Sequence, residues 1–449
     1  MSKNTSQYDR LINTPIPRLV IEMGIPGIVS MMITTVYNMV DTWFVAQLGT
    51  QAVAACGVTF SIMELMMSLG YLFGTGGGTA IGLLLGAKQG EEANRIGSTA
   101  FAVTIALGCT IAALGVAFIT PIMRFLGASE QVLPYAIDYG LFILLGFPVM
   151  SGSLVLSTVL RFEGKMKLAT LGIISGGVLN MVLDPILIFG LDMGITGAAL
   201  ATFLSQLAGF VLLISFYARG MSEVKLRLRH IALRADVLRR IMVTGLPSLT
   251  RHGVATLSNT AMNIAAGMYG GDVRIASLSI VGKVMSLLMA VIKGLSQGST
   301  TIFSYNRGAG RFDRVKKTFG ISLSMMMAIA VAFVVIFVPL SGGVIRCFNA
   351  SDAQVVAVGS KAFRIQLLSL LVMPVGFMAN QLLQAVGEPM KSTFLAALPQ
   401  GVFYIPAVFL LPLLFGADGV LYAPILGYAL TAIVAVPMVR GYFGRMGKG

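Results

Sequence analysis

The sequence predicts an all-α polytopic membrane protein, with twelve transmembrane helices in two pseudo-symmetric six-helix lobes. Three observations predict this fold class. The composition is strongly apolar, continuous apolar stretches of about 20 residues or more recur along the chain, and the second half repeats the first at an offset of about 220 residues.

The composition excludes a water-soluble globule and a disordered chain. Of the 449 residues, 56% are hydrophobic and 11% are charged, and the mean hydropathy is +0.86. A soluble domain carries about 25% charged residues. A transmembrane β-barrel is also disfavoured, because its strands would be short and alternating, whereas the apolar stretches here are long and continuous. At about 37 residues for a span and its connection, the chain has room for twelve helices.

The distribution of basic residues predicts the orientation of the spans. The spans are expected near residues 19–46, 53–84, 96–119, 132–159, 168–190, 195–217, 241–268, 274–304, 318–340, 356–383, 392–415 and 419–439. Of the 32 Lys and Arg residues, 24 fall on the side of the two termini and only Arg124, Arg274 and Arg346 on the other. Lys and Arg collect in cytoplasmic loops, so both termini are expected in the cytoplasm. The same rule accounts for the net charge of +14 without a nucleic-acid partner.

The expected organisation places a basic linker almost at the midpoint of the chain. The polar first eighteen residues show no signal-peptide pattern, so we expect them to stay in the cytoplasm. The full division is 1–18 as a cytoplasmic N-terminal segment, 19–217 as the N-terminal lobe, 218–240 as the linker, 241–439 as the C-terminal lobe and 440–449 as a cytoplasmic tail.

An internal repeat relates the two halves. The matching pairs are Gly24-Ile25-Pro26 with Gly245-Leu246-Pro247, Gly74 with Gly294, Gly78 with Gly298, and Gly194 with Gly416. Six spans restore the starting side of the membrane, so the repeats are parallel and related by an axis along the membrane normal. Transporters use this arrangement to expose a central cavity to one side and then the other, although channels can be pseudo-symmetric too.

Several site types lack their sequence signatures. The run Gly74-Thr75-Gly76-Gly77-Gly78 has neither the Gly-Lys-Ser/Thr ending nor the preceding strand of a nucleotide-binding loop. Three scattered cysteines and two histidines show no disulfide or metal spacing. We therefore expect no enzyme and no cofactor, and transport that is passive or driven by an ion gradient.

Acidic residues within predicted spans point to the first lobe. These residues are Glu22, Asp41, Glu64, Asp138 and Asp184, whereas the second-half acids Asp272, Asp313, Asp352, Glu388 and Asp418 lie in or beside loops. A carboxylate at membrane depth costs about 2.5–3.5 kcal/mol on insertion scales, so it normally has a partner or a function. The first lobe is therefore the candidate for ion coupling.

The candidate ion site combines four oxygen-bearing residues. Asn180 and Asp184 are four residues apart on one helix face, and Pro185 weakens the backbone ladder beside them. With Asp41 and Thr202 they supply hard oxygen ligands, which suit a proton or Na⁺ better than a soft metal. If Na⁺ is the ion, these four residues are its predicted ligands. The alternative is that the two carboxyls only hydrogen-bond helices together.

Other polar residues within spans are weaker candidates. Glu64 lies in the middle of the second span among methionines and is a candidate for the cavity wall, as is Asp138. The second lobe instead carries basic residues within its predicted spans. The simpler explanation for these residues is that their side chains reach towards lipid headgroups or cap helix ends. These are Arg251, Lys283, Lys293, Lys361 and Arg364.

Taken in order, these pieces resemble the multidrug and toxic compound extrusion (MATE) family of the MOP flippase superfamily. The most specific are Gly24-Ile25-Pro26, Val40-Asp41-Thr42, Asn180 with Asp184-Pro185, and Gly194-Ile195-Thr196-Gly197-Ala198-Ala199. The resemblance spans nearly the whole chain. It implies two six-helix lobes around a V-shaped cavity and export of lipophilic, mostly cationic compounds in exchange for H⁺ or Na⁺.

The resemblance also assigns residues. The first-lobe ion site of the family maps onto Asp41, Asn180, Asp184 and Thr202, which places the chain in the branch coupled through the N-terminal lobe. Tyr37 and Tyr139 resemble its cavity tyrosines, and we add Asn38 and Glu64 to the expected substrate cavity. Pro26, with Gly24 before it, matches the point at which the first span bends.

The resulting functional hypothesis is a multidrug efflux antiporter that works by rocking of two lobes. Its partners would be small organic cations or drugs, H⁺ or Na⁺, and the lipid bilayer. We expect a monomer in the prokaryotic plasma (inner) membrane. The main alternative is a flippase for lipids or lipid-linked oligosaccharides of the same superfamily, because the second-lobe cations could meet a diphosphate. A membrane enzyme or receptor is disfavoured, since no clustered nucleophile, base or metal set is evident.

Overall fold

The computed structural model of the chain describes residues 7–348 and 352–446, and within them every regular element is a helix. In order the elements are α1 (Gln7–Asn13), α2 (Ile16–Ala46), α3 (Thr50–Gly86), α4 (Gly90–Ala117), α5 (Ile119–Phe125), α6 (Leu133–Leu145), α7 (Phe147–Phe162), α8 (Met166–Pro185), η1 (Ile186–Gly190), α9 (Gly194–Ala218), η2 (Leu228–His230), α10 (Ala235–Gly308), α11 (Phe312–Phe348), α12 (Ala353–Ser369), α13 (Met373–Ala385), α14 (Pro389–Ala397), η3 (Leu398–Val402), α15 (Tyr404–Phe415), η4 (Gly416–Asp418) and α16 (Gly419–Met446).

The predicted twelve-helix membrane fold is confirmed. Eight helical segments are long and apolar enough to cross a membrane, and the bent pairs α6–α7 (43°) and α12–α13 (47°) raise the number to ten. One of those segments, Pro389–Met446, holds two crossings, α14–α15 and α16, which turn at η4. The part of α10 before its break at Gly271 supplies the remaining crossing. This count covers only the described residues.

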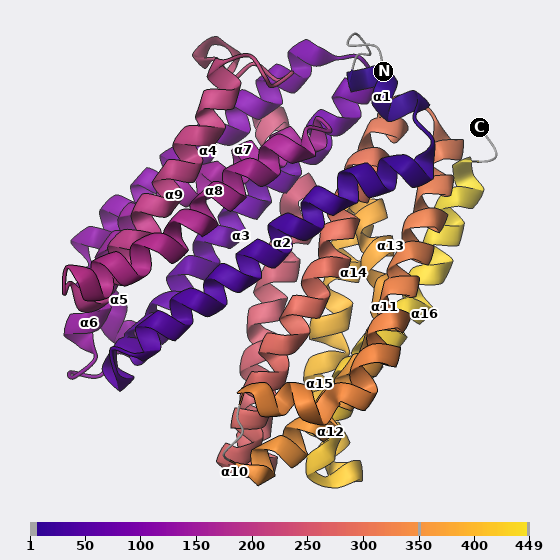
Figure 1. Cartoon of the computed structure of the whole chain (residues 1–449). Coiled ribbons are helices and arrows are strands. Elements are labelled where there is room, and N and C mark those ends of the chain that lie inside the picture. The colour runs from indigo at the N-terminus through magenta and orange to yellow at the C-terminus, as the bar shows by residue number, and fades with distance from the viewer. Residues whose placement is uncertain (1–6, 349–351, 447–449) are drawn as a thin grey trace. The chain divides into compact units, whose positions relative to one another are not determined.

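The helices divide into two compact units. Unit 1 comprises residues up to Leu11 together with Val29–Gly245, and unit 2 comprises Ile12–Ile28 together with the residues from Leu246 onward. In unit 1, α4, α7, α8 and α9 run side by side (Figure 1), and α3 packs against α4, α6 and α7. In unit 2, α16 packs against α12, α13 and α15. Each unit therefore has a helical core of its own.

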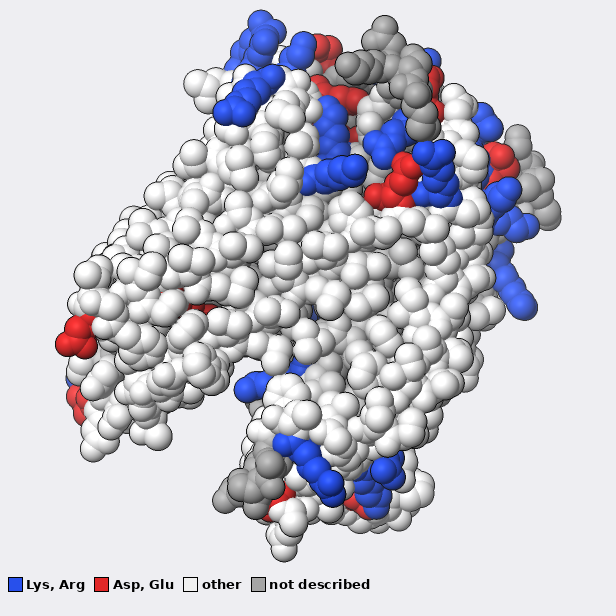
Figure 2. Space-filling view, viewed as in Figure 1, with Lys and Arg blue, Asp and Glu red and all other residues white. Residues whose placement is uncertain are grey.

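The outer surface of the helices is apolar because lipid, not water, is its solvent. Large hydrophobic side chains are exposed along the spans, for example Val211, Leu257, Val335 and Ile433. In Figure 2 the white surface of the helix bodies carries few charges, and Lys, Arg, Asp and Glu gather near helix ends. This is the pattern expected of side chains that must stay out of hydrocarbon.

The first helix of each half begins on the unit formed mainly by the other half. The stretch Ile12–Ile28 lies in unit 2, where a Cβ added to Gly298 would come within 2.6 Å of the Met23 carbonyl carbon. In unit 1, a Cβ added to Gly76 would come within 2.9 Å of the Gly245 backbone nitrogen. Backbone approaches this close are possible only because glycine has no side chain.

A pair of glycines matched by the internal repeat, Gly24 and Gly245, lies at these two crossings. A Cβ on Gly24 would collide with Leu295, and one on Gly245 would collide with Leu72. The repeated glycines therefore hold equivalent helix crossings in the two units. In both helices the passage from one unit to the other falls within a few residues of the repeated proline, Pro26 in α2 and Pro247 in α10.

Gly298→Ala should destabilise the protein, because the new methyl group meets the backbone of α2, which cannot move aside. We expect a loss of about 1–3 kcal/mol, the usual cost of overpacking. Gly282→Ala on the same helix is the matched control, since its Cβ would meet nothing within 4 Å. The thermal unfolding midpoints of the two variants in detergent test this. Equal midpoints would show that the crossing is not tight.

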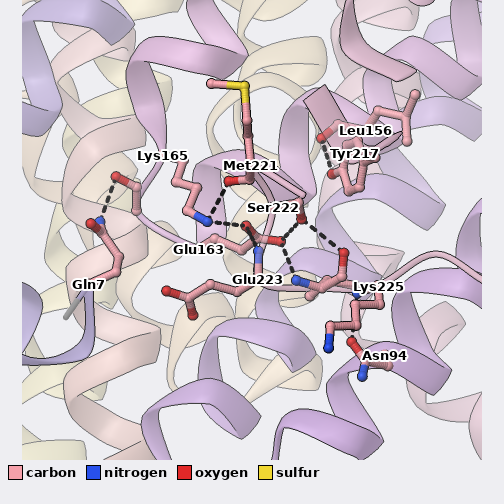
Figure 3. A network of polar contacts seen from close by, with 12 residues as sticks. Gln7, Asn94, Leu156, Glu163, Lys165, Tyr217, Met221, Ser222, Glu223 and Lys225 are labelled. Atoms are coloured by element: carbon pink, nitrogen blue, oxygen red, sulfur yellow. Dashed lines mark hydrogen bonds and ion pairs between the residues drawn. The ribbon is translucent and has the colours of Figure 1, made fainter. Parts of the chain in front are cut away.

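The linker between the halves is fastened to the end of unit 1 by a buried carboxylate (Figure 3). Glu163 follows α7 and its side chain is fully buried. The Ser222 hydroxyl donates to Glu163 Oε1 (2.6 Å), and the backbone N–H groups of Glu223 and Val224 donate to Oε2 (2.9 Å) and Oε1 (3.1 Å). Lys165 Nζ lies 3.7 Å from Oε2. One carboxylate thus satisfies three linker donors.

Side chains of α4 hold the rest of the linker. The Lys225 backbone N–H donates to Asn94 Oδ1 (2.7 Å), and the Ala232 N–H donates to Thr99 Oγ1 (2.9 Å). Helix α10 already begins at Ala235, so the last residues of the predicted linker are helical. The linker is therefore held against the helices of unit 1 by hydrogen bonds.

The attachment of the linker should weaken as pH rises. Burial raises the pKa of the Glu163 carboxyl above its ordinary value of 4.5, even though Ser222 and the Glu223 N–H favour the charged form. The folded state then holds the proton more tightly than the unfolded state. Stability from this group is full at low pH and is lost as pH passes the raised pKa.

Hydrogen exchange of the linker amides tests this. Protection factors at Glu223 and Val224 should be larger at about pH 5 than at about pH 8, and Glu163→Gln should abolish the difference. Glu92→Gln, at a partly exposed acid in the first turn of α4, is the control and should keep it. A Glu163→Gln protein with an unchanged pH dependence would assign the effect to another group.

Candidate functional site

The structure brings the two predicted coupling carboxyls of unit 1 together. Asp41 lies near the end of α2 and Asp184 near the end of α8, and their side chains are close enough to interact electrostatically. Two charged carboxylates repel each other unless one of them is protonated or a cation lies between them. The pair is therefore suited to binding one positive charge.

Asn180 belongs to the same cluster. Its Nδ2 donates to Asp184 Oδ1 across 3.1 Å, as the four-residue spacing on one helix face predicts. Pro185 directly follows Asp184 and lacks an N–H, and the chain continues as the π-helical turn η1 rather than as α-helix. Pro185 thus interrupts the regular α-helical hydrogen bonding next to Asp184.

Glycines let α9 lie directly against α8. A Cβ on Gly197 would meet the Leu187 carbonyl oxygen at 2.7 Å, and a Cβ on Gly209 would meet the Gly172 carbonyl oxygen at 2.9 Å. Thr202 lies between these two contacts along α9 and is buried. Because α9 packs along α8 at both contacts, Thr202 is at about the level of Asn180 on α8. The helix packing therefore supports the predicted neighbourhood of Thr202.

Two tyrosines and a cysteine surround the carboxyls. Tyr37 lies one turn before Asp41, and a Cβ on Gly177 of α8 would come within 3.0 Å of its ring. Tyr139 is buried in α6 and is close enough to Cys56 of α3 to interact with it. Both Tyr139 and Cys56 interact electrostatically with Asp41. The predicted cavity tyrosines thus flank the carboxyl pair.

Three oxygen atoms in this cluster have unused hydrogen-bonding capacity. Asp41 Oδ1, Asn180 Oδ1 and Asp184 Oδ2 are buried and accept no hydrogen bond from any residue that the structure describes. A buried polar atom of this kind costs free energy unless a ligand satisfies it. Carboxylate and amide oxygens are hard ligands, so the donor set fits H⁺ or Na⁺. Among described residues, no group of three or more His, Cys, Asp and Glu side chains could hold a metal ion.

Cys56 is the member of the cluster that the sequence did not reveal. It is a half-buried free thiol on α3. In the sequence, an isolated cysteine in an apolar span looks the same as a cysteine that only fills space between helices. Its position relative to Tyr139 depends on how α3 and α6 pack. The sequence of α3 or α6 alone therefore gives no signal that Cys56 and Tyr139 lie close together.

The remaining predicted residues are less closely grouped. Asn38 is exposed and Glu64 is half-buried. Asp138 is exposed, next to the buried Tyr139. Pro26 and Gly24 belong to unit 2 and lie at the start of α2, apart from the carboxyl pair along the helix. Among the second-lobe cations, Lys361 pairs with Asp418, which also pairs with Arg274, and Arg364 donates to Ser341 Oγ.

Known proteins match this chain along almost its whole length. A multidrug export protein MepA from Staphylococcus haemolyticus (strain JCSC1435) is 28% identical over 432 residues, covering 96% of this chain and 94% of the relative. A crystal structure of a MATE protein in complex with MaL6 is 25% identical, with a TM-score of 0.94 over 99% of this chain and 100% of that one. An outward-facing multidrug resistance MATE family transporter of the MOP superfamily is 24% identical, with a TM-score of 0.94 and full coverage of both chains.

The family profile named MatE matches residues 26–186 and 247–437. These matches, together with the helical membrane fold, confirm the resemblance that the motifs of the chain indicated. The chain belongs to the MatE family of multi-pass membrane transporters.

Proposed function

We propose that this protein is a secondary active multidrug efflux antiporter, which exports lipophilic or cationic organic compounds in exchange for H⁺ or Na⁺. The family and the multidrug export relatives support the cargo class. The observation that carries the coupling is the set of three buried oxygens of Asp41, Asn180 and Asp184 that accept no hydrogen bond from described residues. We further propose that the protein acts as a monomer in a prokaryotic inner membrane, with both termini in the cytoplasm.

The mechanism follows from charge. An ion bound between Asp41 and Asp184, with Asn180 and Thr202 as further ligands, neutralises the carboxyl pair and weakens its attraction for an organic cation. The cargo then leaves, and the empty transporter returns with the ion. Exchange requires only that the ion and the cargo disfavour each other by about 1–3 kcal/mol. Tyr37, Tyr139, Asn38 and Glu64 are the proposed cavity residues.

The proposed hinge is Pro26, with Gly24 on the same helix. Proline removes one backbone hydrogen bond and weakens the helix locally. The passage of α2 from unit 2 to unit 1 falls between Ile28 and Val29, just beyond this proline. A change at Asp41, farther along α2, can therefore be transmitted to the point where the helix joins the other unit. Rocking of the two lobes about such points is the proposed transport movement.

Asp41→Asn should fold but lose ion-driven export, because a neutral amide cannot exchange the coupling charge. In proteoliposomes loaded with ethidium, we expect the export rate under an imposed gradient to fall at least about tenfold, a loss of about 1.4 kcal/mol in coupling. Asp192→Asn is the matched control, since this exposed acid is in the same unit and has no place in the proposed site or cavity. Separate pH and Na⁺ gradients identify the ion. Full export by Asp41→Asn under the effective gradient would reject the proposed coupling site.

A further inference from the structure

The linker lies along the beginning of α4 and is attached there through its backbone. Besides the two hydrogen bonds to α4 described above, the Arg227 N–H donates to Ser98 Oγ across 3.2 Å. A Cβ added to Gly97 of α4 would come within 2.7 Å of Val224 Cγ1, so the linker packs directly on the helix. Because its main chain is held in this way, linker side chains that point away from α4 are presented at fixed positions.

Helix α4 sets the depth of this contact in the membrane. Its 28 residues rise about 42 Å at about 1.5 Å per residue, whereas the hydrocarbon layer is about 30 Å thick. About four residues at each end of α4 therefore project into the headgroup layer. The linker partners Asn94, Ser98 and Thr99 lie close to the start of the helix. The attached part of the linker is therefore at the border between headgroups and hydrocarbon.

Two leucines of the linker point away from the protein. Leu228, in the turn η2, is 88% exposed, and Leu233 is 69% exposed. In water, neither side chain would gain anything from its position. At the border of the hydrocarbon the same side chains can enter the lipid, which removes their apolar surface from water. The depth of the linker and the exposure of the leucines therefore both indicate contact with the bilayer.

Basic residues flank Leu228 on both sides. Arg227 and Arg229 are exposed and have no carboxylate partner in the described part of the chain, and Arg229 Nε donates only to the ring of His230 (3.3 Å). The exposed Lys225 adds a third positive charge. Figure 2 shows Lys and Arg side chains gathered at the end of unit 1 that carries the linker. The exposed leucine is thus combined with positive charge.

The acids of the linker and of its surroundings do not neutralise these arginines. Glu223 interacts electrostatically with Lys165 instead. The other acids are engaged with other groups, namely Glu92 with Arg95 (3.4 Å), Asp236 with Arg234 (3.2 Å), Glu91 with His230 (4.0 Å) and Glu163 with the linker donors. The two arginines therefore remain available for an anion from outside the chain.

We propose that residues 225–233 of the linker form a binding site for an anionic phospholipid. Arg227 and Arg229 donate charge-assisted hydrogen bonds to the phosphate, and Leu228 between them contacts the acyl chains. Charge complementarity alone would also suit a soluble acidic protein, but a leucine at this depth is better satisfied by acyl chains. The phospholipid is a bound partner of unit 1 and not cargo, so the site is independent of the proposed ion exchange.

Native mass spectrometry of the full-length protein in detergent tests this site. The protein is equilibrated with dioleoyl phosphatidylglycerol or, separately, with dioleoyl phosphatidylcholine, and the dissociation constant of the first bound lipid is determined. The unmodified protein should prefer phosphatidylglycerol. The double variant Arg227→Gln with Arg229→Gln should weaken phosphatidylglycerol binding at least about tenfold and phosphatidylcholine binding less than about twofold, because each basic residue contributes about fivefold to binding of an anionic lipid.

Three variants serve as controls. Lys316→Gln with Lys317→Gln removes two exposed charges from α11 of unit 2 and should keep the preference, and Arg227→Lys with Arg229→Lys should keep most of it. Leu228→Ser should weaken phosphatidylglycerol binding about threefold, because it removes the contact with acyl chains. Equal losses in the two Gln double variants would overturn the inference, since net charge alone would then attract the lipid. Unchanged binding by Leu228→Ser would also overturn it, in favour of a soluble acidic partner.

Discussion

The constraint on which the structure depends is the cost of placing charge where water is scarce. Asp41 and Asp184 share one buried cluster with Asn180, and part of the hydrogen-bonding capacity of each remains unused. An isolated carboxylate at this depth would be destabilising, and this cost is the physical basis of the proposed ion site. The proline-terminated α8 and the glycine-rich contact between α8 and α9 are consequences of building such a cluster inside a helical bundle.

Glycine has a second structural role in this chain, which is to let helices cross at backbone distance. Gly298 against α2 and Gly76 against the start of α10 use the same device in the two units. Because each unit receives the beginning of the other half's first helix, neither half is a self-contained domain in sequence. Helices α2 and α10 therefore each contribute residues to both units.

The two units differ in the sign of their membrane charges. Unit 1 has the carboxyl pair, whereas unit 2 has Lys293 and Arg251. The buried Glu163, in contrast, is a structural group, since linker donors and Lys165 occupy its oxygens.

The sequence alone determined the membrane class, the twelve spans, the repeat and the family, because hydropathy and glycine and proline spacing are local properties of a helix. It also indicated Asp41, Asn180 and Asp184, since a carboxylate within an apolar run is anomalous wherever it packs. Only the tertiary structure showed that Asp41 meets Asp184, that Cys56 meets Tyr139 and that Ile12–Ile28 belongs to unit 2. These facts depend on which helix faces meet across long separations in the chain, and no periodicity within one helix encodes its partner.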